Sequence, residues 1–425
     1  MLYERWRTIA RERGDALALC DLADGRRWTF ERLAQATERM DSLEAFSWVF
    51  PHGGRAEFVL RVLEGWRQGR VVCPLETGQS PPRDRLIPEG AVHFKTTSGS
   101  TGAARGVWFT GEQLAADADQ IVATMGLRPE WPNLAALSLA HSYGFSNLVL
   151  PLLLHGIPLY LAPAPLPEVI RRAGREIGDL TLPGVPVLWR TWHDAGAIPE
   201  SLRLAISAGA PLPLELEAEV HRTRGLHIHN FYGSTECGGI AFDAGEVPRT
   251  DPRWVGTPMR GVRLERDAEG CLVVHSAAVG GGYLPEPDPC LVPGRFRTSD
   301  LADLSAGGVV LLGRMADTIN VAGRKVHPDE IEGVLRRHEE VRDCVVFGIP
   351  DPSQARGDAI LAWVVPREGE AGAEWEAQLR SFLLAQLPAW KVPQRILIRD
   401  CLPVNERGKV PRSALRDQIL GSPRG

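Results

Sequence analysis

The sequence predicts an α/β protein with two domains. Its 425 residues exceed one ordinary domain, and an apolar fraction of 44% with 24% charged residues is typical of a globular protein. Before residue 90, short apolar runs alternate with segments of helical periodicity, and this pattern is typical of strands joined by helices. These observations together predict sheets covered by helices.

The N-terminal segment predicts two strands, a helix and a βαβ unit. Residues 16–21 and 26–28 read as strands on either side of an Asp24-Gly25 turn. Thr29 is placed to cap a helix that runs to about Met40. The βαβ unit follows as a strand at 46–50, a helix at 55–67 and a strand at 70–75.

A stretch rich in glycine and hydroxyl groups runs from Lys95 to Val107 and leads into an apolar strand. Its members are Thr97, Ser98, Gly99, Ser100, Thr101, Gly102 and Gly106. Glycines let backbone N–H groups turn toward one point, and the hydroxyls add donors, so the stretch suits an oligophosphate. It is not a Walker loop, because no Gly-Lys-Ser/Thr closes it. A flexible surface loop is the alternative reading.

Further buried strands deliver polar groups in the middle of the chain. After a helix from Thr110 to about Met125, a strand at 134–139 leads to His141, and a histidine at a strand end is commonly structural. A strand at 202–207 ends in Ala208-Gly209-Ala210-Pro211, where small side chains leave room for a flat ligand or for a tight turn.

The next polar stretch follows a strand predicted at 226–229. It reads Asn230-Phe231-Tyr232-Gly233-Ser234-Thr235-Glu236. Its carboxylate and hydroxyl oxygens are groups that a hard cation and its phosphate partners prefer. This stretch is therefore a second candidate for nucleotide chemistry.

In this order along the chain, these motifs resemble those of the adenylate-forming (AMP-binding) superfamily, and the closest resemblance is to its short acyl-/aryl-CoA ligase-like members. Three later motifs extend the resemblance: Arg295–Asp300, Gly313–Asp317 and Asn405–Lys409. The resemblance implies a large multi-layer α/β N-terminal domain, residues 1–316, and a small α+β C-terminal lid domain, residues 317–425. It also implies a hinge at Asp317 and, after it, a loop around Gly323 beside a pantetheine channel.

The resemblance implies a set of nucleotide-binding residues. The phosphates would be held by Thr97, Ser98, Gly99, Ser100, Thr101 and Gly102. The adenosine would be held by Gly209, Ala210, Asn230, Phe231, Tyr232, Gly233, Ser234, Asp300 and Arg314. Among these, an aromatic residue would stack on adenine and Asp300 would accept hydrogen bonds from the ribose hydroxyls.

The catalytic set implied by the resemblance is Lys409, Glu236, Thr101 and His141. Lys409 would neutralise charge between the carboxylate and the α-phosphate, and Glu236 would hold Mg²⁺, with Thr235 on the phosphate. His141 would line the mouth of the acyl pocket. Family members that use α-amino acids place an Asp near this point, and no acid occurs between residues 133 and 157, so a small aryl or short hydrophobic acid is the expected substrate.

The implied activity is an ATP-dependent, AMP-forming ligation of an acid to a thiol. ATP, Mg²⁺ and coenzyme A, or the phosphopantetheine of an acyl carrier protein, are the expected cofactors and partners. Three positions depart from the family pattern, namely Arg105, Ser299 and Asn320. Two alternatives therefore stay open, which are a stand-alone adenylation module that loads a carrier protein and a relative that has lost catalysis.

Charge and cysteine content exclude several other classes. A net charge of −5 gives no indication that the protein binds nucleic acid or an anionic membrane. The seven cysteines are scattered without metal-cluster spacing, which favours a reducing, cytoplasmic setting. The most apolar segment, 148–166, is interrupted by prolines, His155 and Gly156, so it reads as a buried helix and strand and not as a membrane span.

Overall fold

The computed structural model describes residues 1–40, 47–82, 87–96, 105–305, 307–322, 324–350, 358–367, 373–403 and 412–421. This part of the chain divides into two compact units. The first unit contains Met1–Glu265, Val273–Arg297 and Leu304–Val309, and the second contains Arg266–Leu272, Thr298–Asp303 and Val310–Gly425.

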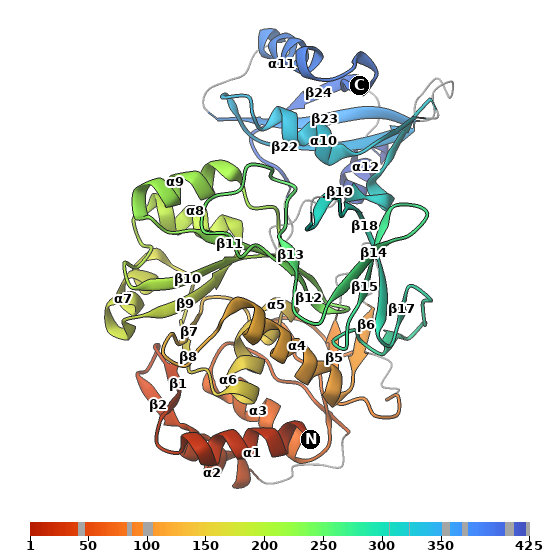
Figure 1. Cartoon of the computed structure of the whole chain (residues 1–425). Coiled ribbons are helices and arrows are strands. Elements are labelled where there is room, and N and C mark those ends of the chain that lie inside the picture. The colour runs from red at the N-terminus through yellow and green to blue at the C-terminus, as the bar shows by residue number, and fades with distance from the viewer. Residues whose placement is uncertain are drawn as a thin grey trace. The chain divides into compact units, whose positions relative to one another are not determined.

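The first unit contains a long sheet with the strand order β13-β12-β11-β10-β9-β7-β8-β1-β2 (Figure 1). In chain order its strands are β1 Leu17–Asp21, β2 Arg26–Thr29, β7 Asn133–Ala135, β8 Leu159–Leu161, β9 Leu180–Gly184, β10 Leu202–Ser207, β11 Ile228–Ser234, β12 Gly238–Phe242 and β13 Thr257–Pro258. The run from β1 through β8, β7, β9 and β10 to β11 is parallel throughout. The carboxyl ends of these strands therefore meet along one edge of the sheet.

Helices cover both faces of this sheet. One core cluster joins the sheet to α7 Pro167–Ile177, α8 Pro186–Asp194 and α9 Leu214–Arg224, with Trp189 and Trp192 fully buried. Another cluster joins it to α4 Gly111–Met125 through Ile121 and Met125. Side chains alternate along β10, since Leu204 and Ile206 belong to the second cluster and Ala205, between them, belongs to the first. The layers are therefore helix, sheet and helix.

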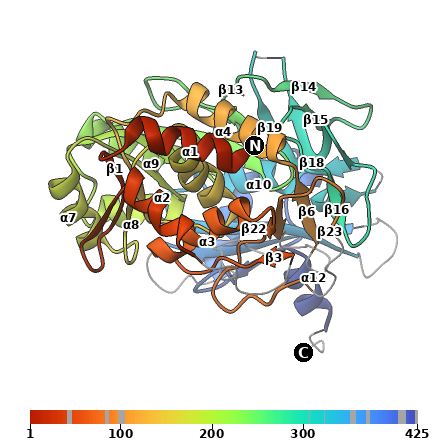
Figure 2. The same cartoon turned by 90° about the horizontal axis from the view of Figure 1, so that it is seen from below.

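The N-terminal helices form a group of their own. They are α1 Leu2–Arg13, α2 Phe30–Glu38 and α3 Ala56–Arg67. Figure 2 shows α1 beside α2, and α1 also packs on α6 Leu150–His155. Between α4 and α6 lie the short α5 Ser142–Gly144 and the π-helical turn η1 Phe145–Val149. The apolar segment at 148–166 is thus a buried helix followed by β8, as predicted.

A second sheet of the first unit has the order β16-β6-β5-β4-β3. Its strands are β3 Trp48–Val49, β4 Val71–Val72, β5 His93–Thr96, β6 Gly106–Phe109 and β16 Gly282–Leu284. Strands β3 and β4 are parallel and joined by α3, which confirms the predicted βαβ unit. Gly282 begins β16 and pairs with Trp108.

Two predicted helix starts are confirmed by their capping contacts. The Thr29 hydroxyl accepts a hydrogen bond from Arg32 N at 3.1 Å. At α4 the Thr110 hydroxyl and the Gln113 side chain form a reciprocal capping box. These contacts satisfy N–H groups that the helix itself cannot pair.

A further sheet has the order β14-β15-β18-β17, with β19 paired to β18. Its strands are β14 Arg263–Arg266, β15 Cys271–His275, β17 Leu291–Val292, β18 Arg295–Asp303 and β19 Val310–Arg314. In this sheet β18 pairs antiparallel with both β17 and β19.

The second unit contains a small α+β fold. Its remaining elements are η2 Met315–Asp317, β20 Ile319–Val321, β21 Arg324–Val326, α10 Pro328–Leu335, β22 Val341–Pro350, β23 Asp358–Pro366, α11 Ala373–Gln386, η3 Ala389–Lys391, β24 Arg395–Ile398 and α12 Arg412–Gly421. Apolar side chains of α10 and α11 pack on β22 and β23. The predicted fold class is confirmed, whereas the boundary between residues 316 and 317 stays a prediction. No helix in the described part of the chain combines the length and hydropathy that a membrane span requires.

Candidate active site

Three of the predicted site segments follow parallel strands of the long sheet. His141 comes shortly after β7, Gly209 and Ala210 come after β10, and Thr235 with Glu236 comes after β11. Strand β9 lies between β7 and β10, and all four strands are parallel. The segments consequently emerge at the same carboxyl edge, which is where α/β sheets bind their ligands.

The glycine-rich loop is described only through the strands that flank it. The predicted phosphate ligands Thr97, Ser98, Gly99, Ser100, Thr101 and Gly102 lie outside the described residues. At the base of the loop, Thr96 of β5 pairs with Gly106 of β6. A Cβ at Gly106 would lie 1.8 Å from the Phe94 ring, so glycine is required at this point of closure.

The Asn230–Glu236 stretch forms one strand and the tip of a hairpin. Gly233 pairs with Gly239 and Ser234 with Gly238, so Thr235 and Glu236 lie in the turn between β11 and β12. Gly238 has a φ of +68°, and a Cβ there would lie 2.0 Å from Asp117 Oδ1. We name residues 235–237 the hairpin tip.

The two aromatic residues of this strand have different environments. Phe231 is buried in the core beneath α4, and its ring centroid lies 5.8 Å from that of Tyr143. Tyr232, whose side chain points to the opposite face, is half-buried. Tyr232 is therefore the aromatic candidate for a ligand contact, while Asn230, which is 5% exposed, pairs with Ser207 of β10.

His141 caps a short helix rather than standing alone. Its Nδ1 accepts a hydrogen bond from Tyr143 N at 3.2 Å. In the neutral ring an accepting Nδ1 places the proton on Nε2. Gly209, on the next segment, has a φ of +85° and is exposed, as is Ala210. The strand-to-helix turn and the room for a ligand thus occur together at residues 208–211.

Glu236 has a partner that the sequence did not indicate. The Tyr283 hydroxyl donates to Glu236 Oε1 at 2.9 Å, and Gly280 N donates to the Glu236 carbonyl at 2.8 Å. Burial raises the pKa of the Tyr283 phenol above its ordinary value, and the Glu236 charge raises it further, so the phenol stays a donor. Only the pairing of β16 with β6 brings Tyr283 to this place.

Arg105 lies over the Tyr283 ring. Its guanidinium carbon is 5.2 Å from the ring centroid, and its Nη1 is 3.2 Å from Asp288 Oδ2. A cation over an aromatic face and beside a carboxylate is held in position. Arg105 is the departure from the family pattern at the end of the glycine-rich loop, and the structure shows that this cation is engaged beside the tyrosine that contacts Glu236.

In the second unit, Asp300 and Arg314 are direct partners on neighbouring strands. They are opposite one another in the pairing of β18 with β19, and Arg314 Nε donates to Asp300 Oδ1 at 3.1 Å. The Asp300 backbone N–H donates to the Thr298 hydroxyl at 3.0 Å. The Asp300 carboxylate is 18% exposed, and the contact with Arg314 orients it.

The predicted hinge residue Asp317 takes part in an ion cluster of the second unit. Arg412 donates to Asp317 at 2.7 Å, to Asp329 at 2.5 Å and to Glu332 at 2.7 Å. Lys409 and Gly323, which the resemblance places in the catalytic and pantetheine loops, lie outside the described residues.

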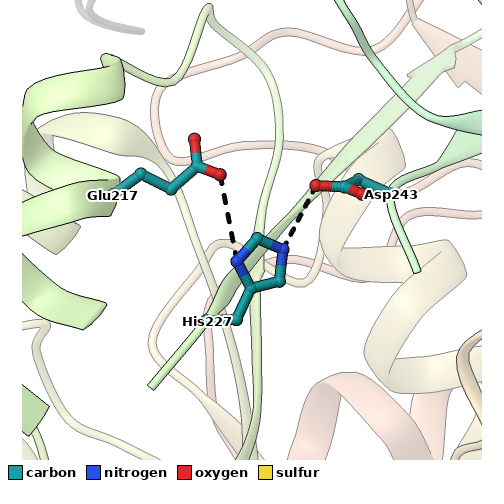
Figure 3. Close-up of side chains that lie close together, drawn as sticks. All are labelled: Glu217, His227 and Asp243. Carbon is teal, nitrogen blue, oxygen red and sulfur yellow. Dashed lines mark hydrogen bonds and ion pairs between the residues drawn. The ribbon is translucent and has the colours of Figure 1, made fainter. Parts of the chain in front are cut away.

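Another cluster, formed by Glu217, His227 and Asp243, has the composition of a metal site. His227 lies between Glu217 and Asp243, and Figure 3 shows the two carboxylates facing different nitrogens of its ring. Asp243 Oδ2 lies 3.1 Å from Nε2, and Glu217 Oε1 lies 3.9 Å from Nδ1. One ion cannot use both nitrogens of a ring, so the three groups do not converge on one cation.

A buried arginine, Arg249, adds a positive charge to this cluster. Its Nη2 lies 2.8 Å from Glu217 Oε2, and both side chains are buried. Burial, the largest single effect, opposes ionisation of Asp243, but the hydrogen bonds from His227 and Gly245 N and the charges of His227 and Arg249 together hold the pKa of the carboxyl below its usual value. The arrangement is a buried charge network that attaches the chain after β12 to α9.

Comparison with known proteins identifies the family. The AMP-binding enzyme family matches residues 61–284, and the AMP-binding enzyme C-terminal domain matches residues 330–409. A probable 2-succinylbenzoate–CoA ligase of Mycobacterium tuberculosis is 31% identical over 341 residues, which cover 77% of this chain and 84% of that protein. A feruloyl-CoA synthase of Amycolatopsis is 29% identical over 345 residues, covering 75% and 68%.

Solved structures share the fold. ATP-bound MatB from Rhodopseudomonas palustris superposes with a TM-score of 0.85 at 22% identity and 99% coverage of both chains. The o-succinylbenzoate CoA synthetase of Bacillus subtilis, with its acyl-adenylate, gives a TM-score of 0.82 at 20% identity, covering 99% of this chain and 98% of that one. The family matches and the likeness to the ligases agree, and the chain belongs to the AMP-binding enzyme family.

Proposed function

We propose that this protein activates a carboxylic acid with ATP and then transfers the acyl group to the thiol of coenzyme A. In the first step a carboxylate oxygen attacks the α-phosphorus, and the bond to pyrophosphate breaks to leave an acyl-adenylate. In the second step the thiol attacks the acyl carbon, and AMP leaves. Family membership supports this proposal, as does the likeness to relatives named as acid–CoA ligases.

The observation that carries the proposal is the construction of the hairpin tip. Glu236 is presented at the carboxyl edge of the sheet by β11, and the Tyr283 phenol holds one of its oxygens at 2.9 Å. Arg105, at the end of the glycine-rich loop, lies against the same tyrosine. A carboxylate and an arginine placed at the margin of a phosphate-binding loop are groups that position a metal–nucleotide.

The donor set around Glu236 fits Mg²⁺. The carboxylate is half-buried and supplies hard oxygen, and Mg²⁺ is commonly bound by one or two carboxylates together with substrate phosphates. When bound, the ion neutralises charge on the phosphate oxygens. In this chain Glu236 would hold the ion, and Tyr283 would keep the carboxylate oriented toward it.

The other roles follow from position and chemistry. Tyr232 is the aromatic side chain that we assign to adenine stacking, and the exposed Gly209 and Ala210 offer it a flat opposite surface. We assign the ribose hydroxyls to Asp300, with Arg314 orienting its carboxylate. The remaining assignments, made from the sequence motifs, are the phosphates to residues 97–102 and Thr235, and charge neutralisation at the α-phosphate to Lys409.

We assign the substrate to small aryl or short hydrophobic acids. No acidic residue occurs between 133 and 157, so this stretch offers an ammonium group no partner, and burying such a group unpaired is costly. His141 and the small residues at 208–210 leave room for a flat acid. The relatives named for 2-succinylbenzoate and ferulate are consistent with this class.

ATP–pyrophosphate exchange across a panel of acids tests the proposal. Benzoate- and cinnamate-like acids should support exchange, and α-amino acids should not. Coenzyme A in one assay and a purified carrier protein in another identify the acceptor. Thioester formation with the carrier protein alone would favour an adenylation module, and absence of exchange with every acid would favour a relative that has lost catalysis.

A further inference from the structure

A buried ion pair lies behind the candidate site. Lys95 Nζ donates to Ser146 Oγ at 3.0 Å, and Ser146 Oγ donates to Asp117 Oδ2 at 2.6 Å. Lys95 Nζ is also 3.6 Å from Asp117 Oδ2. The exposed fractions of Lys95, Ser146 and Asp117 are 4%, 3% and 2%, so the three side chains are enclosed by protein.

The members of this network come from segments that border the site. Lys95 belongs to β5, immediately before the strand end that enters the glycine-rich loop. Asp117 is in the middle of α4, and Ser146 lies in the π-helical turn that follows His141. The network therefore joins the phosphate-loop strand to the His141 segment.

Asp117 extends the network to the hairpin tip. Its second oxygen, Oδ1, accepts a hydrogen bond from Gly239 N at 3.3 Å. The contact is close because Gly238 has no side chain, since a Cβ there would lie 2.0 Å from Oδ1. Glu236 is two residues from Gly238, so the carboxylate of α4 fixes the base of the turn that presents Glu236.

Stability alone does not account for such a pair. Removing two charges from water is expensive, and replacing a buried ion pair by apolar residues of similar volume is often neutral or stabilising. The pair instead fixes the orientation of the Asp117 carboxylate. Lys95 also lies 4.7 Å from the centroid of the Phe109 ring, which limits where its ammonium can go. The Asp117 carboxylate is thus held in one orientation, with one oxygen toward β5 and the other toward β12.

We propose that Lys95, Ser146 and Asp117 are positioning residues that lock the hairpin tip to the strand entering the phosphate loop. The inference rests on the proposed function. The network touches no substrate, and it sets the spacing between β5, which leads into the phosphate loop, and the turn that presents the carboxylate proposed to hold the metal. Because this spacing is set before the nucleotide arrives, binding of Mg·ATP needs no rearrangement of the tip.

The test is the double variant K95M/D117L, which removes both charges and the bond to Gly239. Its Michaelis constant for Mg·ATP should rise at least tenfold, and that for the acid should change less than threefold. A tenfold loss corresponds to about 1.4 kcal/mol. This difference between the two Michaelis constants distinguishes a positioning role from a loss of stability, because loss of folded enzyme lowers the apparent kcat and leaves both Michaelis constants unchanged. Calorimetric titration with Mg·ATP should show the same loss of affinity.

A conservative variant and a control complete the experiment. K95M/D117N keeps a side-chain oxygen for Gly239 N–H but lacks the cation that orients it, so its Mg·ATP constant should fall between those of K95M/D117L and wild type. E217L/R249M removes another buried ion pair of the same unit, with exposed fractions of 0% and 9% for its two residues. It should alter thermal stability without selective loss of Mg·ATP affinity.

The outcomes separate this inference from the proposed function. A folded K95M/D117L protein with unchanged Mg·ATP affinity, or an equal rise in both Michaelis constants, overturns the positioning role. If K95M/D117L does not fold, Ser146→Ala decides, because it removes only the bridging hydroxyl and should raise the Mg·ATP constant about threefold. If wild-type protein neither binds Mg·ATP nor exchanges pyrophosphate, the proposed function itself is wrong.

Discussion

The contact between Tyr283 and Glu236 allows a quantitative test of the site. Replacing Tyr283 by Phe keeps the ring and its stacking against Arg105, and removes only the hydroxyl that donates to Glu236 Oε1 at 2.9 Å. Hydrogen bonds to charged groups contribute about 1.5–3 kcal/mol. Because Glu236 is half-buried, we expect the lower end of that range, or roughly a tenfold rise in the Mg²⁺ concentration needed for half-maximal exchange.

The assay is a double-mutant cycle on pyrophosphate exchange. Tyr283→Phe, Glu236→Gln and the combined variant are each titrated with Mg²⁺ at saturating ATP and acid. Glu236→Gln should raise the Mg²⁺ requirement more than Tyr283→Phe, since it removes a charged ligand. Once Glu236 is neutral, loss of the hydroxyl should matter little, so the coupling should be about 1 kcal/mol or more.

Tyr160→Phe is the matched control for this cycle. Tyr160 is also buried, but it belongs to β8 and has no role in the proposed site. It should change stability without changing the Mg²⁺ requirement. Effects of Tyr283→Phe and Glu236→Gln that simply add would refute the claim that the phenol acts through Glu236.

Three further predictions concern other parts of the chain. Lys409→Ala should slow adenylate formation by about 10²–10³-fold, or about 2.7–4 kcal/mol by analogy with loss of an oxyanion donor. It should spare thioester formation from pre-made acyl-adenylate. Unchanged ATP–pyrophosphate exchange in this variant would exclude the catalytic role of Lys409. Asp317→Pro should keep adenylation and lose most thioester formation. Proline fixes φ at about −65°, so it should hold the proposed hinge in one position. Asp317→Asn controls for the ion pair with Arg412, and equal loss of both half-reactions in the proline variant would place the pivot elsewhere. Burial, with a smaller effect of the Lys95 charge, lowers the pKa of His93 well below its ordinary value. The neutral His93 ring therefore contributes its full share to the free energy of unfolding above the pKa of about 6.5 that it has in the unfolded chain. Below that pH the free energy of unfolding falls by up to about 1.4 kcal/mol for each pH unit. His93→Asn should flatten that slope in urea unfolding measured from pH 7 to 5, and an unchanged slope would assign it to other groups.

Local elements were predictable because their causes are local. The turn at Asp24-Gly25 and the capping box at Thr110 depend on residues within a few positions of one another. Alternating apolar periodicity predicted strands and helices for the same reason, and the βαβ unit around α3 followed from their order. Even the convergence of His141, Gly209 and Glu236 could be anticipated, since segments that follow parallel strands emerge at one edge.

Contacts between distant segments were decided only by the tertiary structure. Tyr283 meets Glu236 because β16 pairs with β6, and Phe231 is buried because α4 covers its face of the sheet. Asp117 reads in the sequence as one more polar residue of an amphipathic helix, yet packing encloses it with Lys95. A hydrogen bond or ion pair needs both partners within a few ångströms, and that distance depends on how all intervening elements pack. The sequence determined which chemical groups are available to this protein, and the tertiary structure decided which of them act together.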